Sequence, residues 1–252
     1  MGEAIVFTSG KGGVGKTTTI ANIGTGLAQL DKKVVMLDTD MGLRNLDVVM
    51  GLEDQINYNL LDLLENKCRL QQALIRDRRF PNLYLIPASL KAPSMEKYEE
   101  AFQLLIRHLR QEFDYCLIDC PAGIDHGFHF AISVADRAII LTTPQISAVK
   151  DAGRVLKIIN GTSISKVELI INEYDEKMVK RHYMLSKEDI AELFEIPILG
   201  TVPHDYKVVV SQNNGLPVVS MHSKATKSFL FLSRQMIKET EWEGEMSAYD
   251  IS

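Results

Sequence analysis

The sequence predicts an α/β fold with a mainly parallel, twisted sheet and helices on both of its faces. Short apolar runs rich in Val and Ile alternate along the chain with longer segments of helical periodicity, the order expected of a parallel sheet. No repeat, low-complexity stretch or long linker interrupts this alternation, so we expect a single domain over residues 1–238.

The strands are mostly continuous apolar runs, as expected where helices cover both faces of a sheet. We predict strands at Ala4–Thr8, Val34–Leu37, Leu83–Ile86, Tyr115–Ile118, Ala138–Leu141, Val167–Ile171 and Ile198–Val202. Helical segments are predicted at Thr18–Leu30, Met95–Glu112, Ser147–Ile159, Ser186–Phe194 and Ser223–Lys238. Acidic residues follow Ser186 in the first turn of its segment, so we expect Ser186 to cap that helix.

The turn after the first strand carries the main functional signal. Residues 10–17 read Gly-Lys-Gly-Gly-Val-Gly-Lys-Thr and fit the phosphate-binding pattern G-x-x-x-x-G-K-[ST] of P-loop NTPases. Glycines let the backbone aim its N–H groups at a polyphosphate, and the next helix points its positive end at the same anion. The alternative is a glycine-rich turn that binds nothing. The predicted nucleotide contacts here are Gly10, Lys11, Gly12, Gly13, Val14, Gly15, Lys16, Thr17 and Thr18.

Two lysines lie in this loop. Lys16 is placed to bind the β- and γ-phosphates. Lys11 has no obvious task at the same nucleotide, so its amine is either a solvated group or a contact to phosphate charge somewhere else.

Acidic residues follow two of the predicted strands directly, Asp38 and Asp40 after one and Asp119 after another. Ligands of such sheets bind outside the carboxyl ends of the strands. We therefore assign Thr17, Asp38 and Asp119 to Mg²⁺, the acids through water, and Asp40 to orienting the attacking water. The alternative for each acid is a helix cap or a turn residue.

Three later loops complete the predicted site. The loop after Asp119 is a candidate switch, because Gly123 would let an N–H approach the γ-phosphate. Asn172 is assigned to the base, since an amide pairs with both a donor and an acceptor on adenine. Near Pro203, either Asp205 or a backbone group would take the exocyclic amine. A plain turn is the alternative reading of both base-side loops.

Composition restricts the compartment and the partners. The net charge of −5 and the pI of about 5.7 argue against DNA binding by bulk charge, and we expect no specific nucleic-acid partner. Three cysteines, an odd number, indicate a reducing compartment, and Cys116 and Cys120 are expected in the core. Neither a secretory signal nor a bilayer-spanning apolar stretch is apparent, so a cytoplasmic location is predicted.

Residues 239–252 differ from the rest, with five acidic residues and no basic one. We expect an acidic, disordered tail. Such a tail should bind an anionic membrane weakly, because an interfacial helix needs a broad apolar face and cations. In the helix before it, most apolar side chains are expected to pack on the sheet, namely those of Phe229, Leu230, Phe231, Leu232, Met236 and Ile237.

The loop pattern K-G-G-x-G-K-T, which contains Lys11 and Lys16, resembles the deviant-Walker ATPases, a family that includes ParA and MinD proteins. Within that family the chain closely resembles the MinD group of bacterial division-site ATPases. The matching segments are 40–47, 50–52, 119–124, 135–152, 184–186, 200–203 and 214–219. The resemblance extends over about residues 1 to 235.

The resemblance implies an ATP-hydrolysing switch that forms a homodimer with ATP, with catalytic roles for Lys11, Lys16 and Asp40. Lys11 would reach the nucleotide of the partner subunit. The resemblance also implies attachment to the inner face of the cell membrane, a MinC-like inhibitor as partner and a MinE-like activator. The presence of Lys11, Lys16, Asp40 and Asp119 favours this switch. Gly153, where the family usually has an acid, departs from the family in the helix expected to bind the inhibitor, and the acidic tail leaves an alternative open. That alternative is a divergent ATPase or a weakly hydrolysing nucleotide-binding scaffold, of flagellar-number or partitioning type, with a non-membrane partner.

Overall fold

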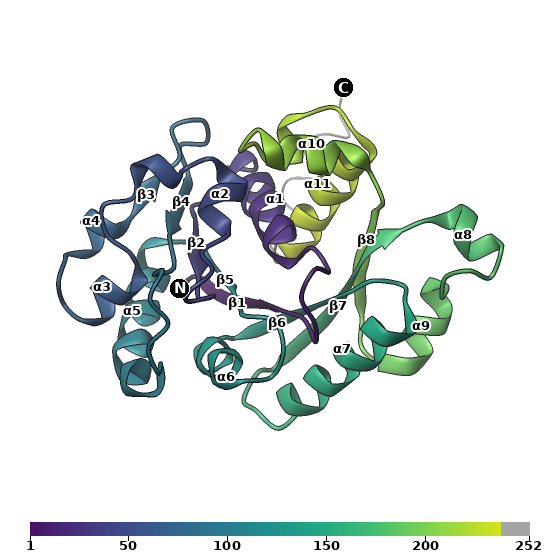
Figure 1. Ribbon diagram of the computed structural model, residues 1–252, viewed down its shortest axis with the longest axis horizontal. Coiled ribbons are helices and arrows are strands. Elements are labelled where there is room, and N and C mark those ends of the chain that lie inside the picture. The colour runs from purple at the N-terminus through teal and green to yellow at the C-terminus, as the bar shows by residue number, and fades with distance from the viewer. Residues whose placement is uncertain (238–252) are drawn as a thin grey trace.

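An eight-stranded sheet forms the centre of the structure, with the strand order β3-β4-β2-β5-β1-β6-β7-β8 (Figure 1). The computed structural model describes residues 1–237, so the predicted tail over residues 239–252 lies outside the described part of the chain. The strands are β1 (Glu3–Thr8), β2 (Val34–Asp38), β3 (Ile75–Arg76), β4 (Leu83–Ile86), β5 (Tyr115–Asp119), β6 (Arg137–Thr142), β7 (Lys166–Tyr174) and β8 (Ile198–Pro203). Every neighbouring pair except β3 and β4 is parallel, which confirms the predicted fold class.

The edge strand β3 has no counterpart among the predicted strands. It is two residues long and pairs antiparallel with β4, with Ile75 opposite Leu85. Two residues are too short a run to show a strand pattern. The strand exists because the chain turns back between the two strands, where the Leu83 N–H donates to the Phe80 carbonyl at 2.9 Å.

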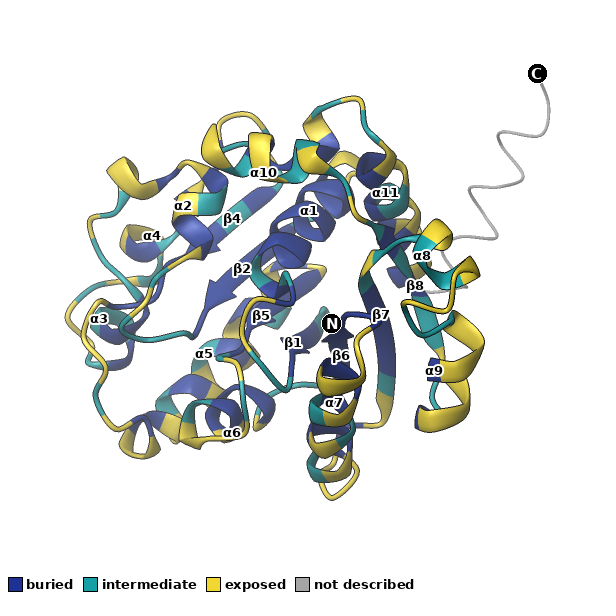
Figure 2. Cartoon of the chain, turned by 45° about the vertical axis from the view of Figure 1, so that its right-hand side comes forward, coloured by how far each residue is buried: buried dark blue, intermediate teal, exposed yellow. Residues whose placement is uncertain are grey.

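Helices cover both faces of the sheet, as predicted (Figures 1 and 2). They are α1 (Lys16–Gln29), α2 (Leu46–Met50), α3 (Leu60–Leu64), α4 (Leu70–Ala73), α5 (Glu99–Glu112), α6 (His126–Ile132), α7 (Ile146–Ile159), α8 (Glu176–Lys180), α9 (Lys187–Phe194), α10 (Tyr206–Asn213) and α11 (Lys224–Met236). Short 3₁₀ helices lie at η1 (Glu53–Gln55), η2 (Glu96–Tyr98) and η3 (Val218–Ser220). Among residues 1–237, no helix is both long and apolar enough to cross a membrane.

Two hydrophobic cores lie on opposite faces of the sheet, because successive side chains of a strand point to opposite sides. In β1, Ala4 and Val6 belong to the core under α3, α5, α6, α7 and α9. Ile5 and Phe7 of the same strand belong to the core under α1, α2 and α11. Figure 2 shows the strands as an almost continuous buried layer between the helices. Each face therefore contributes its own apolar layer to stability.

The packing of α11 bears out the prediction for its apolar side chains. Phe229, Leu232, Met236 and Ile237 are buried against the sheet and α1, whereas Phe231 is 52% exposed. The approach of α11 to α1 is close, since a Cβ on Gly26 would lie 2.2 Å from the Ser233 Oγ.

The helix boundaries show where sequence periodicity is informative. The predicted cap is confirmed, because the Ser186 hydroxyl accepts a hydrogen bond from the Asp189 N–H at 3.0 Å. The predicted start of the long helix at Met95 was wrong, because η2 occupies Glu96–Tyr98 and α5 begins at Glu99. The short helices α4 and α10 were not predicted, since so few turns give little periodicity. The helix α9, which is as short as α10, was predicted because its cap is legible in the sequence. Both Cys116 and Cys120 are buried, as expected.

Candidate nucleotide-binding site

The loop between β1 and α1 leaves one of its sides open. Gly13 and Gly15 have φ angles of 80° and 87°, in the left-handed region that favours glycine. No atom lies within 4 Å of where a Cβ would stand on Gly12 or Gly13. Proteins commonly bind phosphate through open backbone N–H groups and the N-terminus of a helix, and this loop and α1 provide both.

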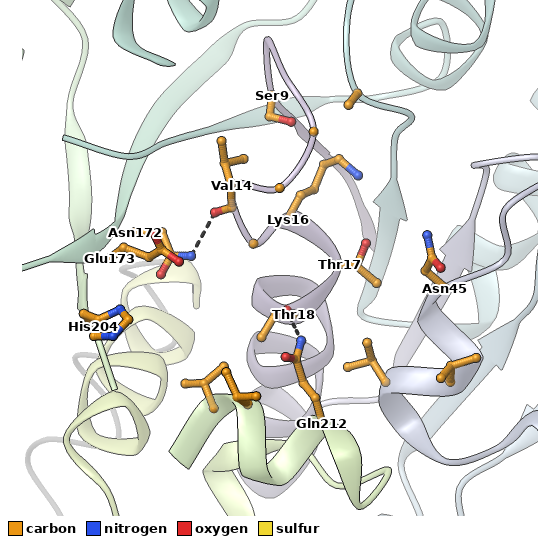
Figure 3. Close-up of a pocket in the computed structure, with 18 of the residues that line it drawn as sticks. Ser9, Val14, Lys16, Thr17, Thr18, Asn45, Asn172, Glu173, His204 and Gln212 are labelled. Carbon is orange, nitrogen blue, oxygen red and sulfur yellow. Dashed lines mark hydrogen bonds between the residues drawn. The ribbon is translucent and has the colours of Figure 1, made fainter. Parts of the chain in front are cut away.

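Two other glycines of the loop are needed for close packing. A Cβ on Gly10 would lie 2.3 Å from the carbonyl carbon of Asp151, so Gly10 lets the loop contact α7. A Cβ on Gly15 would lie 2.2 Å from the Asn172 amide nitrogen. That amide donates a hydrogen bond to the Val14 carbonyl at 2.8 Å and holds the loop against the end of β7 (Figure 3).

A cavity of about 600 Å³ lies beside this open side of the loop (Figure 3). Its volume is in the range of small-molecule and cofactor sites. The predicted site residues in its wall are Gly12, Gly13, Val14, Gly15, Lys16, Thr17, Thr18, Asp40, Asn172, Pro203 and Asp205. The structure therefore brings the loop, the Asp40 segment and both predicted base-side loops around one space.

The remaining predicted residues lie outside the wall of this cavity, namely Gly10, Lys11, Asp38, Asp119 and Gly123. The Lys11 amine lies 3.4 Å from the Ser147 hydroxyl at the start of α7, away from the cavity. Gly123 has a φ of 95°, and its N–H donates to the Ser9 carbonyl at 3.0 Å.

A buried ion pair joins Lys16, which lines the cavity, to Asp119, which lies outside the lining. The Lys16 amine lies 2.7 Å from the Asp119 carboxylate, and the two side chains are 8% and 1% exposed. Burial alone would lower the pKa of Lys16, yet the charge and hydrogen bond of Asp119, with Asp40 nearby, raise it overall. Lys16 is therefore held as a cation at the position that the loop pattern assigns to phosphate binding.

The second strand-end acid, Asp38, lies in register beside Asp119 on the neighbouring strand. Its carboxylate accepts hydrogen bonds from the N–H groups of Asp40 at 2.9 Å, Asn45 at 3.1 Å and Leu46 at 3.2 Å. Burial and the adjacent Asp119 charge raise the pKa of Asp38 to about 7. In this structure Asp38 fixes the segment that runs from Asp40 into α2.

Asp40 is the one acid of this group that is in the cavity wall. Its side chain is half-buried, and burial raises its pKa while the Lys16 cation opposes the rise and Asp119 adds to it. A carboxylate is a weak base even so, and its place in the wall suits orientation of a water molecule better than proton abstraction.

Asp205 is engaged by the backbone. One carboxylate oxygen accepts the Lys207 N–H at 3.0 Å, and the other accepts the N–H groups of Lys224 at 3.0 Å and Ala225 at 3.2 Å. The base contact predicted for this loop therefore falls more naturally to a backbone group or to a neighbour. His204 also lines the cavity at this point.

Several residues of the wall were missed by the sequence prediction, namely Asn45, Val48, Val49, Glu173, His204, Val208, Val209 and Gln212. The Gln212 amide hydrogen-bonds the Thr18 hydroxyl (Figure 3). Asn45 lies within residues 40–47, one of the segments that match the family, so the sequence does indicate this part of the wall. The α10 residues gave no such signal, because the run Val208–Val210 favours a strand rather than a helix.

The fold and this site define a P-loop nucleotide-binding protein. The family described as AAA domain matches residues 2–173. The chain is 48% identical to the septum site-determining protein MinD of Synechocystis over 87% of this chain and 82% of that protein. The chain resembles MinD in a MinC:MinD complex of Aquifex aeolicus, with 41% identity, a TM-score of 0.86 and coverage of 93% and 95%. It also resembles MinD of Pyrococcus horikoshii complexed with Mg-ADP, with 28% identity, a TM-score of 0.84 and coverage of 95% and 98%.

The chain belongs to the MinD family of septum site-determining proteins. It is an ATPase of division-site placement, with ATP or ADP and Mg²⁺ as its cofactors. The site fits them, since a buried cation and an open glycine backbone face the cavity. Within residues 1–237 no three His, Cys, Asp or Glu side chains gather to hold a metal ion. Binding of Mg²⁺ would therefore draw on Thr17, the phosphates and water.

Proposed function

We propose that this chain is an ATP-timed switch that dimerises with its nucleotide between two subunits. The position of Lys11 carries the proposal. Lys16 already supplies the cation behind the chain's own cavity wall, while the Lys11 amine points out of it toward Ser147 on α7. A cation held outward beside a phosphate loop suits contact with the nucleotide of a second subunit.

Each subunit would use its own residues to hold and position the reactants. Lys16 would bind phosphate charge, and Thr17 would ligate Mg²⁺ directly, with Asp38 and Asp119 contacting the metal through its bound water. Asp40 would orient the attacking water. The bound metal supplies charge neutralisation on the phosphates. The rest of the catalysis is positioning, which the strand ends provide because they hold these side chains on buried, hydrogen-bonded backbone.

The partners are proposed from the relatives. The related MinD of Aquifex aeolicus forms a complex with MinC, so we propose a MinC-like inhibitor as a partner of the ATP-bound dimer. A MinE-like activator would then release it by stimulating hydrolysis.

Dimerisation is expected to need both ATP and Lys11. In an Asp40→Ala background, which should retain ATP, analytical ultracentrifugation should show a dimer with Mg-ATP and a monomer with Mg-ADP. Adding Lys11→Ala should weaken the ATP dimer by about thirtyfold or more, because the nucleotide of the partner loses a charge contact.

The matched control is Lys157→Ala, an exposed lysine toward the far end of α7, which should leave the dimer intact. A monomer in ATP without any lysine substitution, or a dimer that is insensitive to Lys11→Ala, would argue against a contact across subunits.

Membrane attachment is expected to be weak for this 252-residue chain. Vesicles of phosphatidylglycerol and phosphatidylcholine should co-sediment little protein with either ATP or ADP, because residues 239–252 carry five acids and no base. The opposite result would be strong ATP-dependent binding that Trp242→Asp removes. Phe231→Asp serves as the comparison, since Phe231 is already 52% exposed on α11 and a charge there is expected to leave the fold intact.

A further inference from the structure

Two short motifs of the sequence have no role in the site described so far. They are Met50–Leu52 and Asn214–Leu216, which lie at the carboxyl ends of α2 and α10. Their glycines contact each other, with Gly51 at a φ of 61° and Gly215 at a φ of 60°. A Cβ on Gly51 would lie 2.7 Å from the Gly215 carbonyl oxygen, and a Cβ on Gly215 would lie 2.6 Å from the Gly51 Cα. The two helix ends therefore meet backbone to backbone.

Arg79 bridges this contact from the β3–β4 hairpin. Its two terminal nitrogens donate to the Met50 carbonyl at 2.5 Å and to the Gly215 carbonyl at 2.8 Å. Asp77, which is 1% exposed, holds the guanidinium with contacts of 2.6 Å and 2.9 Å. The planar guanidinium donates to the two carbonyls from two separate nitrogens and so fixes their separation, whereas the donors of a lysine amine share one nitrogen and fix no such separation.

The two helices that Arg79 joins both contribute residues to the cavity wall. Val48 and Val49 of α2 line the cavity, and so do Val208, Val209 and Gln212 of α10. The two helices lie next to each other beside α1 (Figure 1). Each helix is also bonded to another part of the site. The Leu46 N–H of α2 donates to the Asp38 carboxylate, and the Gln212 amide of α10 hydrogen-bonds the Thr18 hydroxyl of α1.

We propose that Arg79 is a positioning residue for the nucleotide, which sets the width of the cavity by tying α2 to α10. Arg79 is not among the residues that line the cavity. Its effect is to keep the two walls closed on a bound nucleotide and so to slow nucleotide release. The inference rests on the assignment of this cavity to ATP and ADP.

Stopped-flow release of a fluorescent ADP analogue from the full chain tests the inference. Arg79→Lys keeps a positive partner for Asp77 but cannot bind both carbonyls, and it should release the analogue about fivefold faster. Arg79→Ala should act in the same direction and more strongly. Arg76→Lys is the matched control, since Arg76 is exposed on the same hairpin and bonds only the local Pro81 carbonyl among the hydrogen bonds of the described residues.

A second variant separates this role from general loss of stability. Gly215→Ala forces the helix ends apart while Arg79 remains, and it should also speed release. Combining it with Arg79→Lys should add little, because both act on the same contact. The single-turnover hydrolysis rate at saturating ATP should stay at the wild-type value in all folded variants, since Lys16 and Asp40 are untouched.

The outcomes are distinct. A normal binding signal in the wild type, with wild-type release rates in Arg79→Lys and Gly215→Ala, overturns the positioning role alone. Absence of a binding signal in the wild type overturns the nucleotide assignment of the cavity, and the role of Arg79 with it. Should Arg79→Ala fail to fold, Arg79→Lys and Gly215→Ala still decide the question.

Discussion

Replacement of Lys16 by Ala is expected to abolish detectable ATP binding. The amine is 8% exposed and is the cation of the buried pair at the cavity wall, so no neighbouring lysine can take its place. Its loss also leaves Asp119 beside Asp38 without a counter-charge, which would repel a polyphosphate further. We expect the affinity to fall by about a hundredfold or more, the scale of losing one partner of a buried charge pair. Isothermal titration calorimetry with Mg-ATP measures it.

The same substitution should also destabilise the fold, by about 3 kcal/mol, because a buried carboxylate loses its partner. Lys16→Ala with Asp119→Asn separates the two effects. The double variant removes the unpaired charge and should regain thermal stability without regaining ATP binding. Turnover at the wild-type rate in Lys16→Ala would mean that the phosphate site has been assigned to the wrong residues.

Replacement of Asp40 by Ala is expected to stop hydrolysis while ATP still binds. Asp40 lines the cavity and makes no ion pair with a cation among residues 1–237, so its removal leaves the Lys16–Asp119 pair and the loop in place. A misplaced water alone should lower the hydrolysis rate about a hundredfold. Phosphate release measured under single-turnover conditions, beside binding of a fluorescent ATP analogue, separates the two steps.

The matched control is Asp54→Ala, an exposed acid in η1 that lies outside the cavity wall. It should hydrolyse ATP normally. If Asp40→Ala also hydrolyses at the wild-type rate, the orienting group must be sought elsewhere, with Asn45 and Glu173 among the polar residues of the wall.

Much of the fold could be predicted because strands with helices on both faces appear in the sequence as continuous runs of Val, Ile and Leu. The carboxyl ends of those strands then identified Asp38, Asp40 and Asp119 as neighbours of the loop. The directions of side chains could not be predicted in the same way. Asp38 and Asp119 are both strand-end acids, yet one is held by backbone N–H groups and the other pairs with Lys16.

The residues that escaped prediction lie in short elements. β3 and α10 are fixed by tertiary contacts rather than by a sequence pattern of their own. Arg79 follows β3 and Gln212 lies on α10, and both side chains hydrogen-bond groups at the α10 side of the cavity. Asn172 was expected just after a strand that ends at Ile171, but β7 continues to Tyr174, and the Asn172 amide donates to the Val14 carbonyl. Such a bond between segments distant in the chain leaves no trace in local sequence.

Asp205 fixes the backbone on one side of the cavity through hydrogen bonds to two helices. Partial burial opposes its ionisation, but the backbone N–H groups of two helices hold its pKa below the usual value. One carboxylate thus anchors the beginnings of both α10 and α11, and drawing it toward a ligand would uncap both helices at once. The base-side wall is therefore preset before a nucleotide arrives.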